Sequence, residues 1–135
     1  MRHLGGDRFE VHSAGSHPAG FIHPLAVECL TRLSVPMIDL RSKSWDEFLQ
    51  TPVDAVITLC DSAAAETCPV WPGAPIRAHW SIPDPTYHLG VADERIEFAL
   101  RIASRLQTKI QGLVDLDWSV NPQEIQKRLE FLGEI

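Results

Sequence analysis

Residues 53–60, VDAVITLC, form an apolar and β-branched run that ends at a cysteine. Such a run is typical of a strand that is covered on both faces of a sheet. Residues 75–80, PIRAHW, predict a second short strand. Upstream, RFEVHS alternates the apolar Phe9 and Val11 with polar residues, which predicts a further strand that enters a loop at Gly15.

Four segments carry helix signals. FIHPLAVECLTRLSV has apolar residues at helical spacing and Pro24 at the first helical position. SKSWDEFL pairs Ser44 with Glu47 as a capping box for a short helix that buries Trp45 and Phe48. A long helix is predicted over residues 93–116, and NPQEIQKRLEFLG has Asn121 as its cap and Gly133 as its stop. Strands that alternate with helices predict an α/β fold with a mainly parallel sheet flanked by helices.

Length and charge narrow the classes of function. The 135 residues suit a single domain, and the net charge of -6 opposes general attraction to nucleic acid or to anionic lipid. No apolar run approaches the roughly 18 residues that a membrane span needs. The first residues, MRHLGGDRFEVHSAG, have no signal core, so we expect a cytoplasmic protein in which permanent disulfides are disfavoured.

Cys60 and Asp84 are the residues best placed for chemistry. Each follows the carboxyl end of a predicted strand, and ligands of parallel α/β sheets bind at that edge. Asp84 stands between two prolines, as either a general acid or an Asp-Pro turn former. Cys68, eight residues after Cys60, lacks the paired spacing of a zinc site, so we expect no metal. Two unrelated thiols and a redox pair both remain open, whereas Cys29 lies on an apolar helix stripe and is expected to be structural.

Several segments, taken in order, resemble a known family. FEVHSAGSHPAGFIHPLAV, LRSKSWDEF, DAVITLCDSAAAETCPVWPG and HWSIPDPT are similar to successive segments of the bacterial arsenate reductases built on the low-molecular-weight protein tyrosine phosphatase fold. The resemblance implies a three-layer α/β fold. It also implies a phosphatase/arsenate-reductase-like domain over residues 1–118 and a C-terminal helical extension over residues 119–135.

The same resemblance implies a relay of three thiols. In the family, a nucleophilic cysteine of a C-x5-R loop attacks arsenate, a second cysteine displaces arsenite, and in some members a third takes over the disulfide. On this chain Cys60 corresponds to the second thiol, Cys68 to the third and Asp84 to the general acid. The implied partners are arsenate or a phosphate-like oxyanion, with thioredoxin or glutathione/glutaredoxin as electron donor and no bound cofactor.

The chain departs from the family pattern in one respect, because it contains no C-x5-R sequence. We therefore expect an N-terminally truncated form of the fold that is inactive by itself. A low-molecular-weight protein tyrosine phosphatase and a non-catalytic pseudoenzyme that acts as an interaction module are the alternatives. We also expect the chain either to bring RFEVHS and VDAVITL together or to form a homodimer through exposed sheet edges.

Overall fold

Two parallel strands form the sheet in the computed structural model, which describes residues 1–60 and 71–135. Strand β1 (Ala55–Thr58) pairs with β2 (Ile76–His79), so that Ala55 lies opposite Ile76 and Thr58 lies opposite His79. The two strands predicted in residues 53–60 and 75–80 are confirmed, and so is the α/β fold with a parallel sheet.

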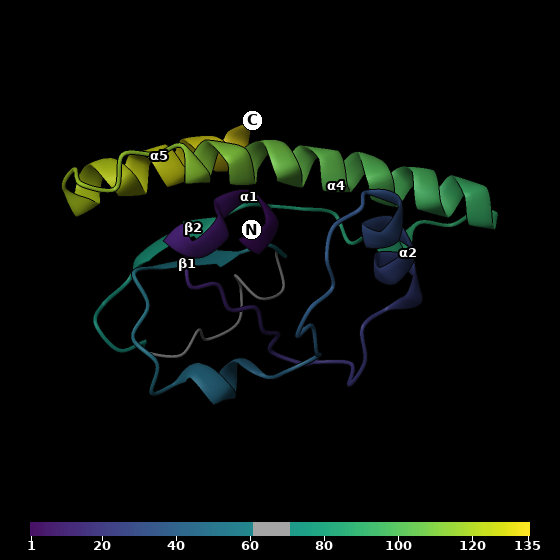
Figure 1. Ribbon diagram of the computed structural model, residues 1–135, viewed down its shortest axis with the longest axis horizontal. Helices are drawn as coiled ribbons and strands as arrows, with labels where there is room; N and C mark the ends of the chain where they lie inside the picture. Colours follow the sequence, from purple (N-terminus) through teal and green to yellow (C-terminus); the bar gives the residue numbers. More distant parts are fainter. Residues whose placement is uncertain (61–70) are drawn as a thin grey trace.

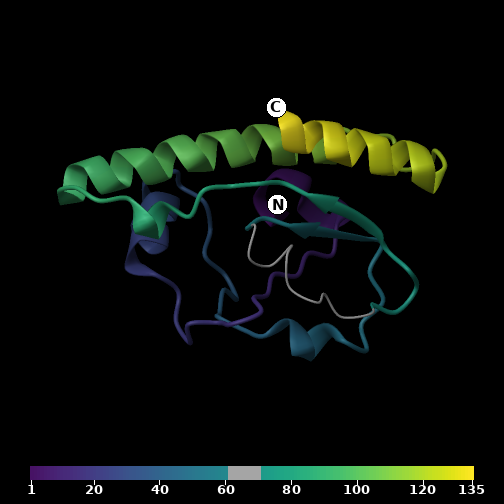
Figure 2. The same ribbon diagram turned by 180° about the vertical axis from the view of Figure 1, so that it is seen from behind.

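Helices α4 (Ala92–Val114) and α5 (Pro122–Glu134) form a layer along one side of this sheet (Figures 1 and 2). A short helix, α1 (Arg2–Gly5), contacts α4. The main core lies between the layer and the strands, and alternate strand residues point into it. Its buried members are Ala78, Trp80, Leu113, Ile125, Leu129 and Leu132.

Helix α2 (Pro24–Arg32) packs against α4 and forms a second cluster with it. Pro24 occupies the start of the helix as predicted, and His23 Nδ1 accepts a hydrogen bond from the Leu25 amide at 3.1 Å. The prediction that Cys29 is buried is confirmed, because it packs with Ile96 and Ala99. Cys29 therefore serves as a small apolar residue of this cluster.

The strand predicted over RFEVHS is wrong, since the structure has none between residues 8 and 14. The nearest contact of strand type is an isolated bridge between Gly15 and Ser44. The Val11 carbonyl accepts a hydrogen bond from the Arg2 guanidinium at 2.7 Å. Among the described residues RFEVHS does not pair with β1, whose ladder partner is β2.

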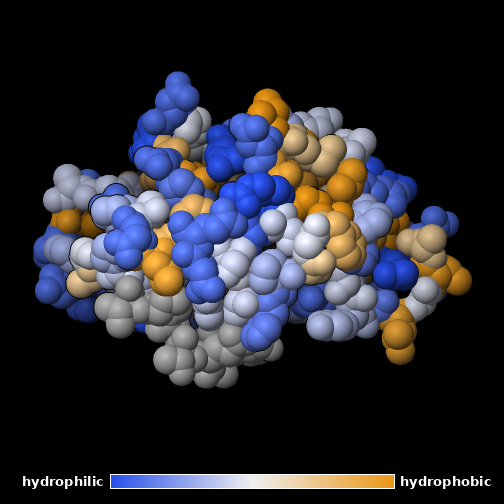
Figure 3. All heavy atoms as spheres, turned by 90° about the horizontal axis from the view of Figure 1, so that it is seen from below, coloured by the Kyte–Doolittle hydropathy of each residue, from blue (hydrophilic) through white to orange (hydrophobic). Residues whose placement is uncertain are grey.

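The face away from α4 and α5 mixes apolar and hydrophilic side chains (Figure 3).

The short helix predicted around Trp45 forms as a 3-10 turn, η2 (Trp45–Phe48). Ser44 caps it by accepting a hydrogen bond from the Asp46 amide at 3.1 Å. Glu47 does not complete the expected capping box, because its carboxylate pairs with Arg41. Trp45 and Phe48 are half-buried.

The last helix, α5, begins as predicted and ends differently. Asn121 Oδ1 accepts from the Glu124 amide at 2.9 Å, but the helix continues through Gly133 to Glu134. Gly133 is therefore not a helix stop. A Cβ at this position would lie 2.8 Å from the His79 carbonyl oxygen and 2.8 Å from Trp80 Cδ1, so close packing against β2 accounts for the glycine.

Candidate active site at the carboxyl edge of the sheet

The chain segments that follow β1 and β2 stay together at the carboxyl edge of the sheet. The Trp80 amide donates to the Thr58 carbonyl at 2.8 Å, and the Ile82 amide donates to the Leu59 carbonyl at 2.8 Å. Cys60 directly follows Leu59, and Asp84 comes two residues after Ile82. The structure therefore brings Cys60 and Asp84 to the edge at which parallel α/β sheets bind their ligands.

Cys60 is exposed at this edge. Cys68, the second thiol expected to take part, lies outside the described residues. Cys29 is far less accessible, and burial raises the pKa of its thiol because a thiolate is poorly solvated there. Of the two described cysteines, Cys60 is the one suited to thiol chemistry.

Asp84 is held by the turn that it begins. It caps the 3-10 helix η3 (Pro85–Tyr87), and its Oδ1 accepts from the Thr86 amide at 2.9 Å and from Thr86 Oγ1 at 2.7 Å. This is the geometry of an Asp-Pro turn former. The other oxygen, Oδ2, takes part in neither contact, so the carboxyl group can be fixed in place and still present an oxygen for proton transfer.

A threonine and a histidine that the sequence did not single out lie at the same edge. Thr58 Oγ1 and His79 Nδ1 are 2.7 Å apart and share a hydrogen bond between the last residues of the two strands. The core lies on the other face of the sheet, because Ala55, Ile57 and Ala78 belong to its cluster. The signal available in the sequence was a polar residue near the carboxyl end of each predicted strand, Thr58 in residues 53–60 and His79 in residues 75–80.

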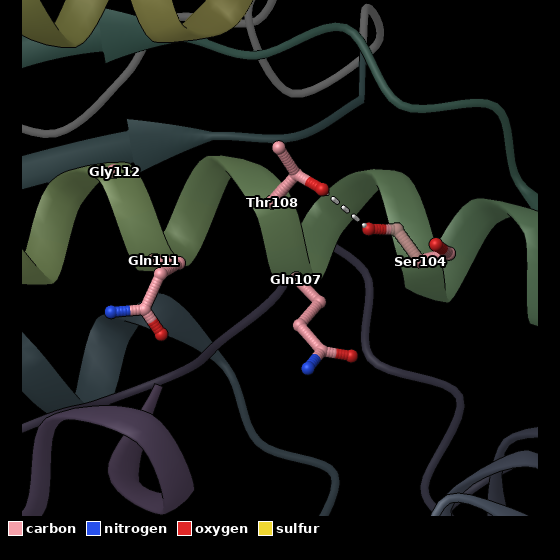
Figure 4. A pocket seen from close by; sticks show the side chains of 5 residues that line it. All are labelled: Ser104, Gln107, Thr108, Gln111 and Gly112. Carbon is pink, nitrogen blue, oxygen red and sulfur yellow. Dashed lines mark hydrogen bonds between the residues drawn. The ribbon is translucent and has the colours of Figure 1, made fainter.

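A hollow in the structure lacks the features of an oxyanion site. It lies along α4, and the described side chains that line it are uncharged (Figure 4). The hydroxyl of Thr108 donates to the Ser104 carbonyl at 3.2 Å, which is a contact within the helix. A site for arsenate or phosphate needs positive charge or converging amide donors. The lining residues are Ser104, Gln107, Thr108, Gln111 and Gly112.

Within residues 1–60 and 71–135, His, Cys, Asp and Glu side chains form no group of three or more that could hold a metal ion. In the same residues, no helix is both long enough and apolar enough to cross a bilayer.

Comparison with known proteins gives consistent matches over most of the chain. The family model described as "Low molecular weight phosphotyrosine protein phosphatase" matches residues 1–129. An arsenate reductase of Halalkalibacterium halodurans is 30% identical over 110 residues, which cover 82% of this chain and 78% of the relative. An arsenate reductase of Bacillus licheniformis is 32% identical over 114 residues, 84% of this chain and 80% of the relative. The arsenate reductase of Bacillus subtilis is 29% identical over 110 residues, with 82% and 78% coverage.

Proposed function

Because the chain belongs to the low molecular weight phosphotyrosine protein phosphatase family, we propose that it serves arsenate reduction through a thiol relay that uses Cys60 and Cys68. The observation that carries the proposal is the exposed Cys60 thiol at the carboxyl edge of the sheet, in a chain whose relatives are named arsenate reductases.

The proposed relay is a series of thiol–disulfide exchanges. Cys60, as a thiolate, attacks the sulfur of a nucleophilic cysteine that carries the arsenic, and arsenite leaves with the electron pair of the broken sulfur–arsenic bond. Cys68 then attacks the Cys60 sulfur, which leaves a Cys60–Cys68 disulfide and releases the first cysteine as a thiol. A dithiol donor, thioredoxin or glutaredoxin, returns two electrons and two protons to this disulfide. Asp84 Oδ2 is the proposed proton donor to the departing oxygen of arsenate.

The 135 residues do not include a C-x5-R sequence, so this chain lacks the nucleophile and the arginine that the relay requires for its first step. We therefore propose that the 135-residue chain does not turn over arsenate by itself. The division into a catalytic domain over residues 1–118 and an extension over residues 119–135 is likewise a proposal.

The test compares two forms of the protein with arsenate, thioredoxin or glutaredoxin, and the matching reductase system. The 135-residue chain is expected to show no arsenate-dependent oxidation of NADPH. A form extended at its N-terminus by the strand and C-x5-R loop of a relative should turn over, and Cys60→Ser in that form should abolish reduction. Turnover by the 135-residue chain, or unchanged turnover in the extended Cys60→Ser protein, would contradict the proposal.

The same proteins distinguish two alternative functions from arsenate reduction. The family match favours a phosphatase, which needs Asp84 but neither Cys60 nor Cys68. The phosphatase would be favoured if the extended form showed phosphatase activity but no arsenate reduction, and if Cys60→Ser left the phosphatase activity unchanged. The lack of a C-x5-R sequence favours a non-catalytic interaction module, for which neither form would turn over arsenate or a phosphate ester.

The proposed homodimer would use the edge of β1. Among the described residues, β1 has a ladder partner on one side, which is β2. The proposed contact would use the backbone groups of Ala55 and Ile57, which point away from β2.

A further inference from the structure

Lys109 of α4 is a fully buried lysine to which the proposed relay gives no role. Its Nζ donates to the carbonyls of Leu132, Gly133 and Ile135 at 2.8, 2.9 and 2.7 Å. An ammonium group has three N–H donors, so each of them has an acceptor. The last carbonyls of a helix lack partners within that helix and form the negative end of its dipole. Lys109 therefore fixes the last turn of α5 to α4.

The turn of α5 that Lys109 fixes lies directly against the end of β2. A Cβ on Gly133 would lie 2.8 Å from the His79 carbonyl oxygen and 2.8 Å from Trp80 Cδ1. One turn earlier in α5, the Leu129 carbonyl accepts a hydrogen bond from Trp80 Nε1 at 2.8 Å. Helix α5 packs over β2, as both ribbon views show (Figures 1 and 2). Because packed interiors leave little free space, the position of this turn determines the positions of His79 and Trp80.

His79 and Trp80 in turn hold the segment that leads to Cys60. The ladder between β1 and β2 ends at the pair Thr58 and His79, whose side chains share a hydrogen bond of 2.7 Å. The Trp80 amide donates to the Thr58 carbonyl at 2.8 Å, and Cys60 is two residues beyond Thr58. A continuous series of contacts therefore connects Lys109 with the segment that carries Cys60.

We propose that Lys109 is a positioning residue for the candidate active site. By fixing the last turn of α5, it fixes the two strand ends from which Cys60 and Asp84 follow. In the proposed relay Cys60 must meet the sulfur of another cysteine, and a misplacement of about 1 Å can lower a rate by about a hundredfold. The proposal rests on the proposed function for the part that Cys60 plays in catalysis, whereas the effect of Lys109 on the strand ends can be measured without turnover.

Hydrogen exchange of the 135-residue chain measures this effect in Lys109→Met, with Ile96→Ala as the control. Both substitutions change a buried residue of α4, but Ile96 belongs to the second cluster, which packs against α2. The reporters are the amides of Trp80 and Ile82, which donate hydrogen bonds between the two strand ends. Each variant is studied at the urea concentration that gives both the same free energy of unfolding, so that a difference reports local opening.

The proposal predicts that the Trp80 and Ile82 amides exchange at least about tenfold faster in Lys109→Met than in Ile96→Ala. The Ala99 amide, which lies in the second cluster, should not exchange faster in Lys109→Met. Equal rates at Trp80 and Ile82 in the two variants would overturn the proposal, because Lys109 would then support only the fold as a whole.

Gly133→Ala tests the same series of contacts from its other end and keeps the test decisive if Lys109→Met does not fold. Its new Cβ presses on the end of β2, whereas the control Asn121→Ala weakens the first turn of α5. At equal free energy of unfolding, the Trp80 and Ile82 amides should exchange faster in Gly133→Ala than in this control. Equal rates here would also overturn the proposal.

Turnover separates this proposal from the proposed function. In the extended form described above, Lys109→Met should lower kcat for arsenate reduction at least about tenfold relative to Ile96→Ala. KM for arsenate should stay within about twofold, because the C-x5-R loop that holds arsenate is not among the contacts of Lys109. An equal kcat in the two variants would overturn the positioning role. If the unsubstituted extended form does not turn over arsenate, the proposed function fails, and hydrogen exchange alone decides the role of Lys109.

Discussion

Gly133→Ala tests the close contact between α5 and β2. Alanine is favoured over glycine in a helix by up to about 1 kcal/mol, and by less in the last turn. Against this gain, the new Cβ would lie 2.8 Å from the His79 carbonyl oxygen and 2.8 Å from Trp80 Cδ1. Neither atom can yield easily, because one belongs to a strand backbone and the other to an indole that is 2% exposed. Overpacking of this kind costs about 1–3 kcal/mol, so we expect a net loss of about 1–2 kcal/mol.

The assay is urea unfolding followed by Trp fluorescence and by circular dichroism, with thermal unfolding as a second measure. Gly133→Ala should lower the midpoint of thermal unfolding by about 3–8 °C, with an unchanged urea m-value. A Gly133→Ala protein that is as stable as wild type would refute the packing argument.

Three other substitutions or modifications follow from contacts in the same structure. Lys109→Met removes the donor to three carbonyls at the end of α5 and should cost about 2–4 kcal/mol in urea unfolding. Burial, and to a smaller extent the charge of Arg105, lower the pKa of Lys109 in the folded protein. Between this lowered pKa and about 10.4, the Lys109 side chain is protonated in the unfolded chain but not in the folded one. Over this pH range the stability of the wild type should therefore rise with pH relative to that of Lys109→Met. Asn121→Ala should lower the free energy of unfolding by about 1 kcal/mol, measured by the same method, because it removes the cap of α5. Asn121→Asp keeps an oxygen that can cap the helix, so it should retain most of this stability. Iodoacetamide at pH 8 should label Cys60 and leave Cys29 unlabelled until urea is added, as peptide mass spectrometry can show, because burial raises the pKa of Cys29.

Local sequence signals predicted the parts of the fold that depend on neighbouring residues. Pro24 and Asn121 mark helix starts because their effects on the first turn need no distant partner. The shared edge of Cys60 and Asp84 also followed from the sequence, since parallel strands place their carboxyl ends together.

The parts that the sequence could not predict depend on distant contacts. A strand requires a partner for its backbone groups, and the alternation in RFEVHS does not reveal that the Val11 carbonyl binds Arg2. Gly133 resembles a helix stop in sequence, whereas its cause is the approach of β2, more than fifty residues earlier. Lys109 gives no sequence sign of burial, because its carbonyl partners belong to another helix.

The central claim is that Cys60 and Cys68 form a redox pair, and disulfide mapping tests it without requiring arsenate turnover. The reduced protein is treated with one equivalent of a thiol oxidant, digested at low pH and analysed by mass spectrometry, before and after addition of reduced thioredoxin or glutaredoxin. The account predicts a Cys60–Cys68 disulfide as the first product, its reduction to two thiols by at least one of the donors, and Cys29 unchanged throughout. A first disulfide that contains Cys29, or a Cys60–Cys68 disulfide that neither donor reduces, would contradict it.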